Sequence, residues 1–166
     1  MKFASSVLAL GFAAVSSVSF AQTCASPTAF NTPPAGPVAS GTTCGGTDSV
    51  SLYCGALDSA SKPDAIYQMT LAAVGPNRTA TQIALSGVTG AGFGPIIVAY
   101  NSTCANGDGC ASTGDGSSAL SLAAVGAGTY FLAVSASPVD ASGACGTFTL
   151  TANGTLPVQL QNFSID

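Results

Sequence analysis

Side chains that transfer protons near neutral pH are scarce in this sequence. It contains no histidine and no tryptophan, its acidic residues are seven aspartates, and lysine and arginine together number three. Without histidine a Ser-His-Asp triad cannot form, and the commonest general base of enzymes is missing. We therefore predict that the chain is not an enzyme, with a small hydrolase as the least favoured function.

Two weak catalytic patterns remain. Ser59 to Lys62 matches the Ser-x-x-Lys pattern of penicillin-binding enzymes, but Pro63 follows at once and the partner motifs of those enzymes are absent. Asp108 and Asp115 could be imagined as the carboxylate pair of a glycosidase. The stretch that holds them, NGDGCASTGDGSS, has the composition of turns. We interpret both patterns as loop sequence.

The shortage of basic residues excludes two classes of partner. Nucleic-acid binding requires clustered lysine and arginine, and attachment to an anionic membrane surface requires the same. Without the first 21 residues the chain keeps Lys62 and Arg78 against seven aspartates, so its net charge is 2 − 7 = −5. Such a chain is typical of a soluble exported protein, with no nucleic acid among its partners.

One long apolar run occurs, and it lies at the N-terminus. The chain starts Met1-Lys2, is apolar from Val7 to Val15, and reaches Ser19-Phe20-Ala21. This is the pattern of a secretory signal peptide, residues 1–21, cleaved after Ala21. The alternative, a membrane anchor, needs about 20 apolar residues, and no later segment provides a transmembrane helix. We expect a secreted protein, extracellular or at the cell surface.

All six cysteines lie after this leader. An even number in an exported chain predicts three disulfides. Zinc is the alternative, but there is no histidine and no Cys-x-x-Cys pair. Spacing along the chain favours Cys104–Cys110 and Cys44–Cys54, and Cys24–Cys145 then follows by elimination.

Short strand-like runs separated by turn residues fill the rest of the chain, which we expect to form one domain. Residues 22–43 contain Pro33, Pro34 and Pro37 and are predicted to be an irregular strap. Residues 44–155 are predicted to be an all-β, jelly-roll-like antiparallel β-sandwich. The expected strands are residues 65–71, 81–85, 95–100, 119–122, 129–134, 146–152 and 158–165.

The run from Thr129 to Val134 predicts a central strand. Alternate side chains of a strand point to opposite faces of the sheet. Both sets here contain large apolar residues, Phe131 on one side and Tyr130 and Leu132 on the other. We therefore expect this strand to be covered on both faces.

Several of these stretches together resemble the bacterial pre-peptidase C-terminal domain. They are Asp64–Tyr67, Pro95–Tyr100 with Cys104 soon after, Gly126–Tyr130 and Gly146–Leu150, which lie within residues 44–152. The resemblance implies a small exported jelly-roll-like sandwich that assists secreted hydrolases. It also implies calcium binding through acidic residues in some members. No peptidase domain is attached in this sequence, which departs from the family's pattern.

Calcium is the one cofactor that the residues allow. Carboxylate and amide oxygens suit this hard cation, and Asn106, Asp108 and Asp115 lie close together in one loop. Asp58 and Asp64 before the first predicted strand are a second set. Neither spacing matches an EF-hand, so the alternative is a group of solvated turn aspartates.

The last eleven residues, 156–166, read LPVQLQNFSID and have two interpretations. They resemble the Leu-Pro-Val-x-Leu-x-x-Phe segment near the C-terminus of many exported bacterial proteins, which would make them a sorting-like tail. Their apolar alternation also predicts a final strand, which we favour.

Three function classes follow from these observations. The first is binding or display, with a cell-wall polymer, an extracellular polymer or a surface protein as partner. A carbohydrate-binding module would expose aromatic residues, and Tyr53, Phe93 and Tyr100 are the candidates. The second is a structural or adhesion subunit that assembles through an edge strand, with Val158–Ile165 as the donor. The third is the small hydrolase.

Overall fold

The computed structural model describes residues 23–30, 36–50, 52–53, 57–58, 62–73, 75, 79–100, 103–104, 110–115 and 119–154. Only the backbone is described for 36–38, 52–53, 57–58 and 110–115. The predicted signal peptide and the tail lie outside the described residues. Among the residues that the structure describes, no helix is long and apolar enough to cross a membrane.

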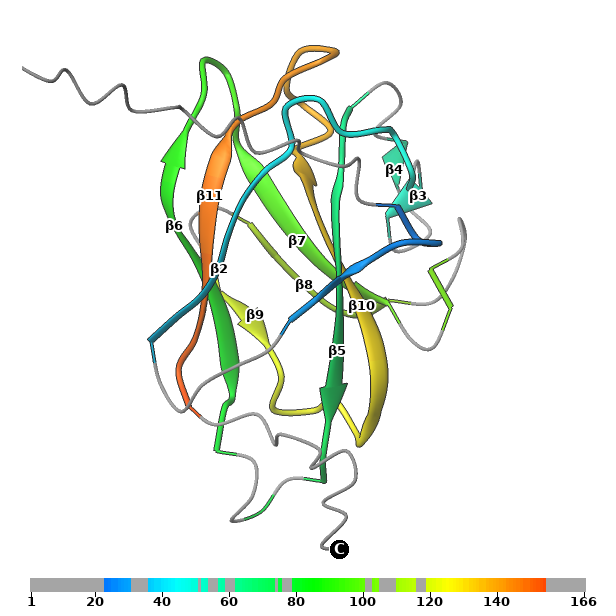
Figure 1. Cartoon of the computed structure of the whole chain (residues 1–166), viewed down its shortest axis with the longest axis vertical. Helices are drawn as coiled ribbons and strands as arrows, with labels where there is room; N and C mark the ends of the chain where they lie inside the picture. The colour runs from blue at the N-terminus through cyan, green and yellow to red at the C-terminus, as the bar shows by residue number, and fades with distance from the viewer. Residues whose placement is uncertain are drawn as a thin grey trace, which may run out of the picture.

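Two β-sheets packed face to face make up the described chain (Figure 1). The five-stranded sheet has the order β1 (Thr28–Ala29), β5 (Ala65–Leu71), β10 (Gly128–Ala136), β7 (Pro95–Tyr100) and β8 (Cys110–Asp115). The four-stranded sheet has the order β2 (Gly36–Thr42), β11 (Thr147–Ala152), β6 (Gln82–Thr89) and β9 (Leu120–Ser121). A small hairpin is formed by β3 (Leu52–Tyr53) and β4 (Leu57–Asp58).

This strand order confirms the predicted jelly-roll-like sandwich. The orders β2-β11-β6-β9 and β5-β10-β7-β8 place the first and last long strands side by side, as in a jelly roll built from two Greek keys. The strand pairs are antiparallel except β1 with β5, which is parallel. Because the two sheets pack face to face, each has one face in the shared core and one face turned outward.

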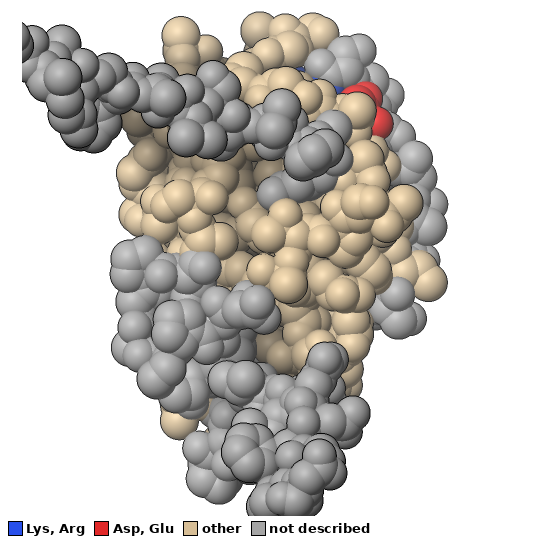
Figure 2. Space-filling model, in the orientation of Figure 1, with Lys and Arg blue, Asp and Glu red and all other residues tan. Residues whose placement is uncertain are grey.

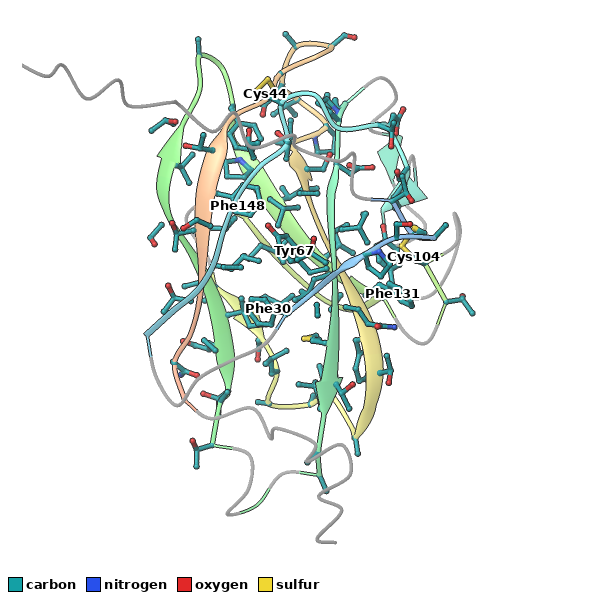
Figure 3. The ribbon with its side chains drawn as sticks, viewed as in Figure 1. Phe30, Cys44, Tyr67, Cys104, Phe131 and Phe148 are labelled. Carbon is teal, nitrogen blue, oxygen red and sulfur yellow. A yellow bond between two sulfur atoms is a disulfide. The ribbon has the colours of Figure 1, made fainter. Side chains whose placement is uncertain are left out.

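The core between the sheets is organised around Tyr67 of β5. Its ring makes edge contacts with Phe30 and with Phe148 of β11, each with a centroid distance of 6.2 Å (Figure 3). Such edge-to-face pairs stabilise a fold by more than the burial of their apolar area alone. Gly41 of β2 faces this cluster, because a Cβ there would lie against the Tyr67 hydroxyl and 2.9 Å from Cζ of Phe148.

Strand β10 is central and covered on both faces, as its sequence predicts. It lies between β5 and β7. Tyr130, Leu132 and Val134 belong to the core between the sheets. Phe131 and Ala133 pack on the opposite face, in a second apolar cluster with Val50, Ile66, Ile96, Val98, Tyr100, Cys24 and Cys104.

The expected irregular strap is wrong for residues 36–42. These residues form β2, which pairs with β11 over its length. Pro37 is tolerated because β2 is an edge strand, and its partner Thr151 lies next to a register shift. Proline removes one ladder hydrogen bond, which costs little at an edge or a bulge.

The interpretation of NGDGCASTGDGSS as turn sequence is also wrong in part. Residues 110–115 form β8, which pairs with β7 and closes one edge of the five-stranded sheet. Glycine and aspartate are poor strand formers. The apolar strand β7 beside β8 supplies the backbone partners that override this preference.

The expected disulfide pairing is contradicted at all three bridges. Cys24 bonds Cys104, and Cys44 bonds Cys145, with Cα–Cα distances of 5.4 and 4.9 Å. Spacing along the chain was a poor guide, because the sheets bring distant segments together. Cys44 follows β2 and Cys145 precedes β11, and those strands pair at Thr42 and Thr147.

The two bridges leave Cys54 and Cys110 as the pair for a third. We expect the mature protein to be six hydrogens lighter than its reduced mass, because six cysteines in an oxidising compartment predict three disulfides. Cleavage without reduction before aspartates and after aromatic residues, followed by mass spectrometry, should show Cys24–Cys104, Cys44–Cys145 and Cys54–Cys110. Alkylation of two thiols in the unfolded, unreduced protein would contradict the third bridge.

Gly41→Ala should destabilise the fold by about 1–3 kcal/mol, because the added methyl group overpacks the aromatic core. Denaturant unfolding with the disulfides intact measures this change. Gly75→Ala is the matched control, since a Cβ at Gly75 meets no atom within 4 Å. Equal stability of the two variants would show that the core adjusts around Gly41.

Candidate functional site

The outward face of the four-stranded sheet carries a row of hydroxyl groups on each long strand. Inward-facing Phe148, Leu150 and Ala152 of β11 are buried, so the alternate residues of this strand point outward. We call the outward hydroxyl-bearing residues of this sheet the hydroxyl face: Ser40, Thr42, Ser86, Thr89, Ser121, Thr147, Thr149 and Thr151.

Hydrogen bonds between strands hold several of these hydroxyl groups in place. The Ser40 and Thr149 hydroxyls lie 3.2 Å apart, and those of Thr89 and Thr147 lie 2.6 Å apart. The Ser86 hydroxyl donates to the carbonyl oxygen of Thr149 at 3.5 Å. A hydroxyl has one donor and two acceptor positions, so these groups keep bonding capacity that faces solvent.

Thr149 is the centre of this face. It lies opposite Ser40 of β2 and opposite Ser86 of β6. Gly87 follows Ser86 at a φ of 58°, where β6 shifts register against β11. A Cβ at Gly87 would lie 3.6 Å from the Thr149 hydroxyl. The absence of a side chain at Gly87 therefore keeps the Thr149 hydroxyl open to solvent.

The hydroxyl face bears no charge. The ionisable side chains that the structure describes and that do not belong to disulfides or tyrosines are Asp48, Lys62, Asp64 and Asp140. None of them belongs to a strand of this sheet. In the view of Figure 2, acidic and basic side chains among the described atoms are confined to one upper corner. The residues of this face therefore offer no charge that would attract a charged partner.

The outward face of the five-stranded sheet is different, because the segment between β2 and β5 covers part of it. Val50 in this segment is fully buried in the cluster with Ile66 and Val98. The carboxylate of Asp64 holds the segment down, since its Oδ2 accepts from the backbone N–H groups of Ser49 and Val50 at 2.8 Å each. Asp64 is itself buried, so its role here is structural.

Lys62 and Asp140 fix the turn that follows β10. Lys62 is buried, and its Nζ donates to the backbone carbonyl of Ser137. Oδ2 of Asp140 accepts from the N–H groups of Gly94 and Ser137 at 2.7 and 3.1 Å. The Lys62 of the Ser-x-x-Lys pattern is thus bonded to backbone, while Ser59 lies outside the described residues.

The structure does not bring the predicted calcium ligands together within its described part. Asn106 and Asp108 lie outside the described residues, and Asp115 is described as backbone only, opposite Ile96. Asp58 is likewise described as backbone, and Asp64 is bonded to backbone N–H groups. Among described residues there is no group of three or more histidine, cysteine, aspartate or glutamate side chains placed to hold a metal.

Two of the three aromatic residues expected on the surface are buried, so that expectation is wrong for them. Tyr100 has no exposed surface and Phe93 is 7% exposed. Tyr100 packs in the second apolar cluster, and Phe93 packs with Ala136 and Ala144. The side chain of Tyr53 lies outside what the structure describes. An aromatic sugar-binding platform therefore loses two of its candidates.

The hydroxyl face itself was missed at the sequence level. The signal was present in Thr147-Phe148-Thr149-Leu150-Thr151, where threonine alternates with apolar residues. That alternation predicts a strand with one polar face. It does not reveal that Ser40 and Ser86, from distant segments, lie beside Thr149.

Asp64→Asn should lower the free energy of unfolding by about 1–3 kcal/mol, because a buried acceptor of two backbone N–H groups loses its charge. Denaturant unfolding measures this loss. Asp48→Asn removes the same charge from an exposed position of the same segment and should change stability much less. Equal effects of the two variants would mean that net charge alone is responsible.

Comparison of the chain with protein-family models, with curated proteins and with solved structures finds no match. The resemblance to pre-peptidase C-terminal domains is therefore supported only in its general part. That part is a two-sheet β-sandwich with disulfides.

Proposed function

We propose that the mature chain is an exported, non-enzymatic binding module. Its hydroxyl face binds an uncharged polymer rich in hydroxyl groups, such as a polysaccharide of the cell wall or the extracellular matrix. The observation that carries this proposal is the concentration of bonded but solvent-facing hydroxyl groups around Thr149, on a face without charge. The disulfides agree with an oxidising compartment outside the cytoplasm.

The chemistry of the face favours a neutral polymer over a charged one or a small sugar. Binding a neutral partner leaves no charged group desolvated and unpaired. Each hydroxyl contact contributes only about 0.5–1.5 kcal/mol net. Useful affinity therefore needs several contacts in a row, which a polymer lying across β2, β11 and β6 provides. The strands are about 4.8 Å apart, so neighbouring rows are within reach of one chain.

The alternative of catalysis has less support. The sequence has no histidine. The buried charged residues that the structure describes, Lys62 and Asp64, bond to backbone groups and so hold segments in place. The resemblance to pre-peptidase C-terminal domains fits a binding role as well, since that family acts beside enzymes.

The double variant Thr147→Val/Thr149→Val should weaken retention on an insoluble neutral polysaccharide, such as cellulose or chitin, about tenfold. Valine keeps the shape and strand preference of threonine but removes two hydroxyl groups, and the loss of about 1.4 kcal/mol corresponds to a factor of ten. A depletion assay with the purified mature protein measures the dissociation constant. Retention should not change with salt, because the face carries no charge.

Thr70→Val/Thr129→Val is the matched control. These two exposed threonines are direct partners on β5 and β10, in the other sheet. The control variant should bind like the unmodified protein. Equal weakening by both pairs, or retention only on an anionic polymer such as carboxymethylcellulose, would contradict binding by the hydroxyl face.

A further inference from the structure

The two disulfides that the structure describes lie in different surroundings. Cys24–Cys104 packs against the second apolar cluster, beside Phe131. Cys44–Cys145 lies at one end of the sandwich, after β2 and before β11 (Figure 3). Cys44 is exposed, whereas the other three of these cysteines are half-buried. Cys44 is therefore the sulfur-bearing residue of these two bridges that solvent reaches most easily.

The chain beside the Cys44–Cys145 bridge leaves room for a molecule to approach. Gly45 follows Cys44 and Gly143 lies two residues before Cys145, and both glycines are exposed. A Cβ at either position would meet no atom within 4 Å. Their φ angles of 82° and 76° also favour glycine over residues with a side chain. Neither glycine therefore screens the bridge from solvent.

The surroundings also affect how readily each bridge can be opened by a thiol. The rate of thiol–disulfide exchange depends on access to the attacked sulfur and on the stability of the thiolate that leaves. Cys24 and Cys104 pack in an apolar cluster, and apolar surroundings disfavour a thiolate. Cys44 and Cys145 belong to none of the apolar clusters of the described residues. Both factors favour exchange at Cys44–Cys145.

Hydrogen bonds hold the two sides of this bridge together without the sulfur atoms. The Thr43 N–H and the Thr42 hydroxyl both donate to the Gly146 carbonyl, at 3.0 and 3.1 Å. The Gly146 N–H donates to the hydroxyl of Thr43, which is fully buried, at 3.1 Å. Because Thr42 also pairs with Thr147, the residues next to both cysteines stay in place when the bridge opens.

We propose that Cys44 is a site of reversible modification by a low-molecular-weight thiol, such as glutathione. The thiolate of the small molecule attacks Sγ of Cys44, and the bond between the two Sγ atoms breaks. Cys145 leaves with the electron pair as a thiolate and takes up a proton. One disulfide replaces another and one thiol replaces another, so the exchange needs no further oxidant or reductant.

The modification is reversible because Cys145 stays beside Cys44. The hydrogen bonds of Thr42, Thr43 and Gly146 keep the new Cys145 thiol close to the mixed disulfide. Attack by Cys145 is then an intramolecular step, with the high effective concentration that such a step has. When the free thiol is withdrawn, Cys145 attacks Sγ of Cys44, the bridge forms again and the small thiol is released.

The test uses the mature protein with its disulfides intact, and reduced glutathione as the thiol. Samples of the native protein are taken over time, the exchange is stopped with acid, and free thiols are alkylated with N-ethylmaleimide. Cleavage before aspartates and after aromatic residues, without reduction, places Cys24, Cys44, Cys104 and Cys145 in four different peptides. Mass spectrometry then shows which cysteine carries glutathione and which carries the maleimide.

We expect the first products to carry glutathione on Cys44 and the maleimide on Cys145. The Cys44–Cys145 bridge should open at least about tenfold faster than Cys24–Cys104, because the rate follows access to the sulfur. The matched control is the protein unfolded in guanidinium chloride, in which both bridges should open at similar rates. Removal of glutathione from the modified native protein by gel filtration should restore the bridge.

The proposal is overturned if both bridges open at equal rates in the native protein. Glutathione on Cys145 with the maleimide on Cys44 also overturns it, because the attacked sulfur is then the other one. A third contrary result is a modified protein that loses its far-UV circular dichroism signal or does not form the bridge again, since Cys145 then does not stay beside Cys44. Polysaccharide binding does not enter this measurement, so the two proposals fail separately.

Discussion

The pairing of β2 with β11 joins the first long strand to the last, and much of the structure depends on it. It places Cys44 beside Cys145, so that a disulfide can close across the end of the sandwich. It places Gly41 over the core, where Tyr67 and Phe148 fill the space that a side chain would take. On the outside it brings Ser40 to Thr149. A single ladder of backbone hydrogen bonds thus supports the disulfide, the core and the hydroxyl face.

The sequence predicts the strands well where apolar residues dominate. The expected bounds of β5 and β7 agree with the structure, because alternation and apolar runs report directly on burial. The sequence-based prediction fails for β2, which contains proline and glycine, and for β8, which contains glycine and aspartate. Both are edge strands of their sheets. Their pairing is decided by the neighbouring strand, β11 for β2 and β7 for β8, and local preference does not contain that information.

Contacts between distant segments also explain why the sequence predicted the cysteine pairing and the exposed aromatic residues wrongly. Pairing cysteines by their spacing assumes that short loops close first, whereas the bridges of Cys104 and Cys145 follow the topology of the sheets. Tyr100 was expected on the surface as a candidate aromatic of a sugar-binding platform, yet it is buried in the second apolar cluster together with Val50. The hydroxyl face depends on strand register, and register is set by the whole fold.

The two outward faces of the sandwich differ in how far the chain covers them. The five-stranded sheet is covered in part by the segment between β2 and β5, through Val50 and the backbone that Asp64 holds. The four-stranded sheet presents exposed hydroxyl groups, and this is where a polymer is proposed to bind.

The Cys44–Cys145 bridge has a consequence for survival among secreted proteases. Its two cysteines are 101 residues apart in the sequence, and the eight strands from β3 to β10 lie between them. Loops are where proteases nick a folded domain. A single cut in any loop between these residues leaves both fragments covalently joined, and the sheets hold them in register. The nicked chain therefore stays one particle, with the hydroxyl face in place.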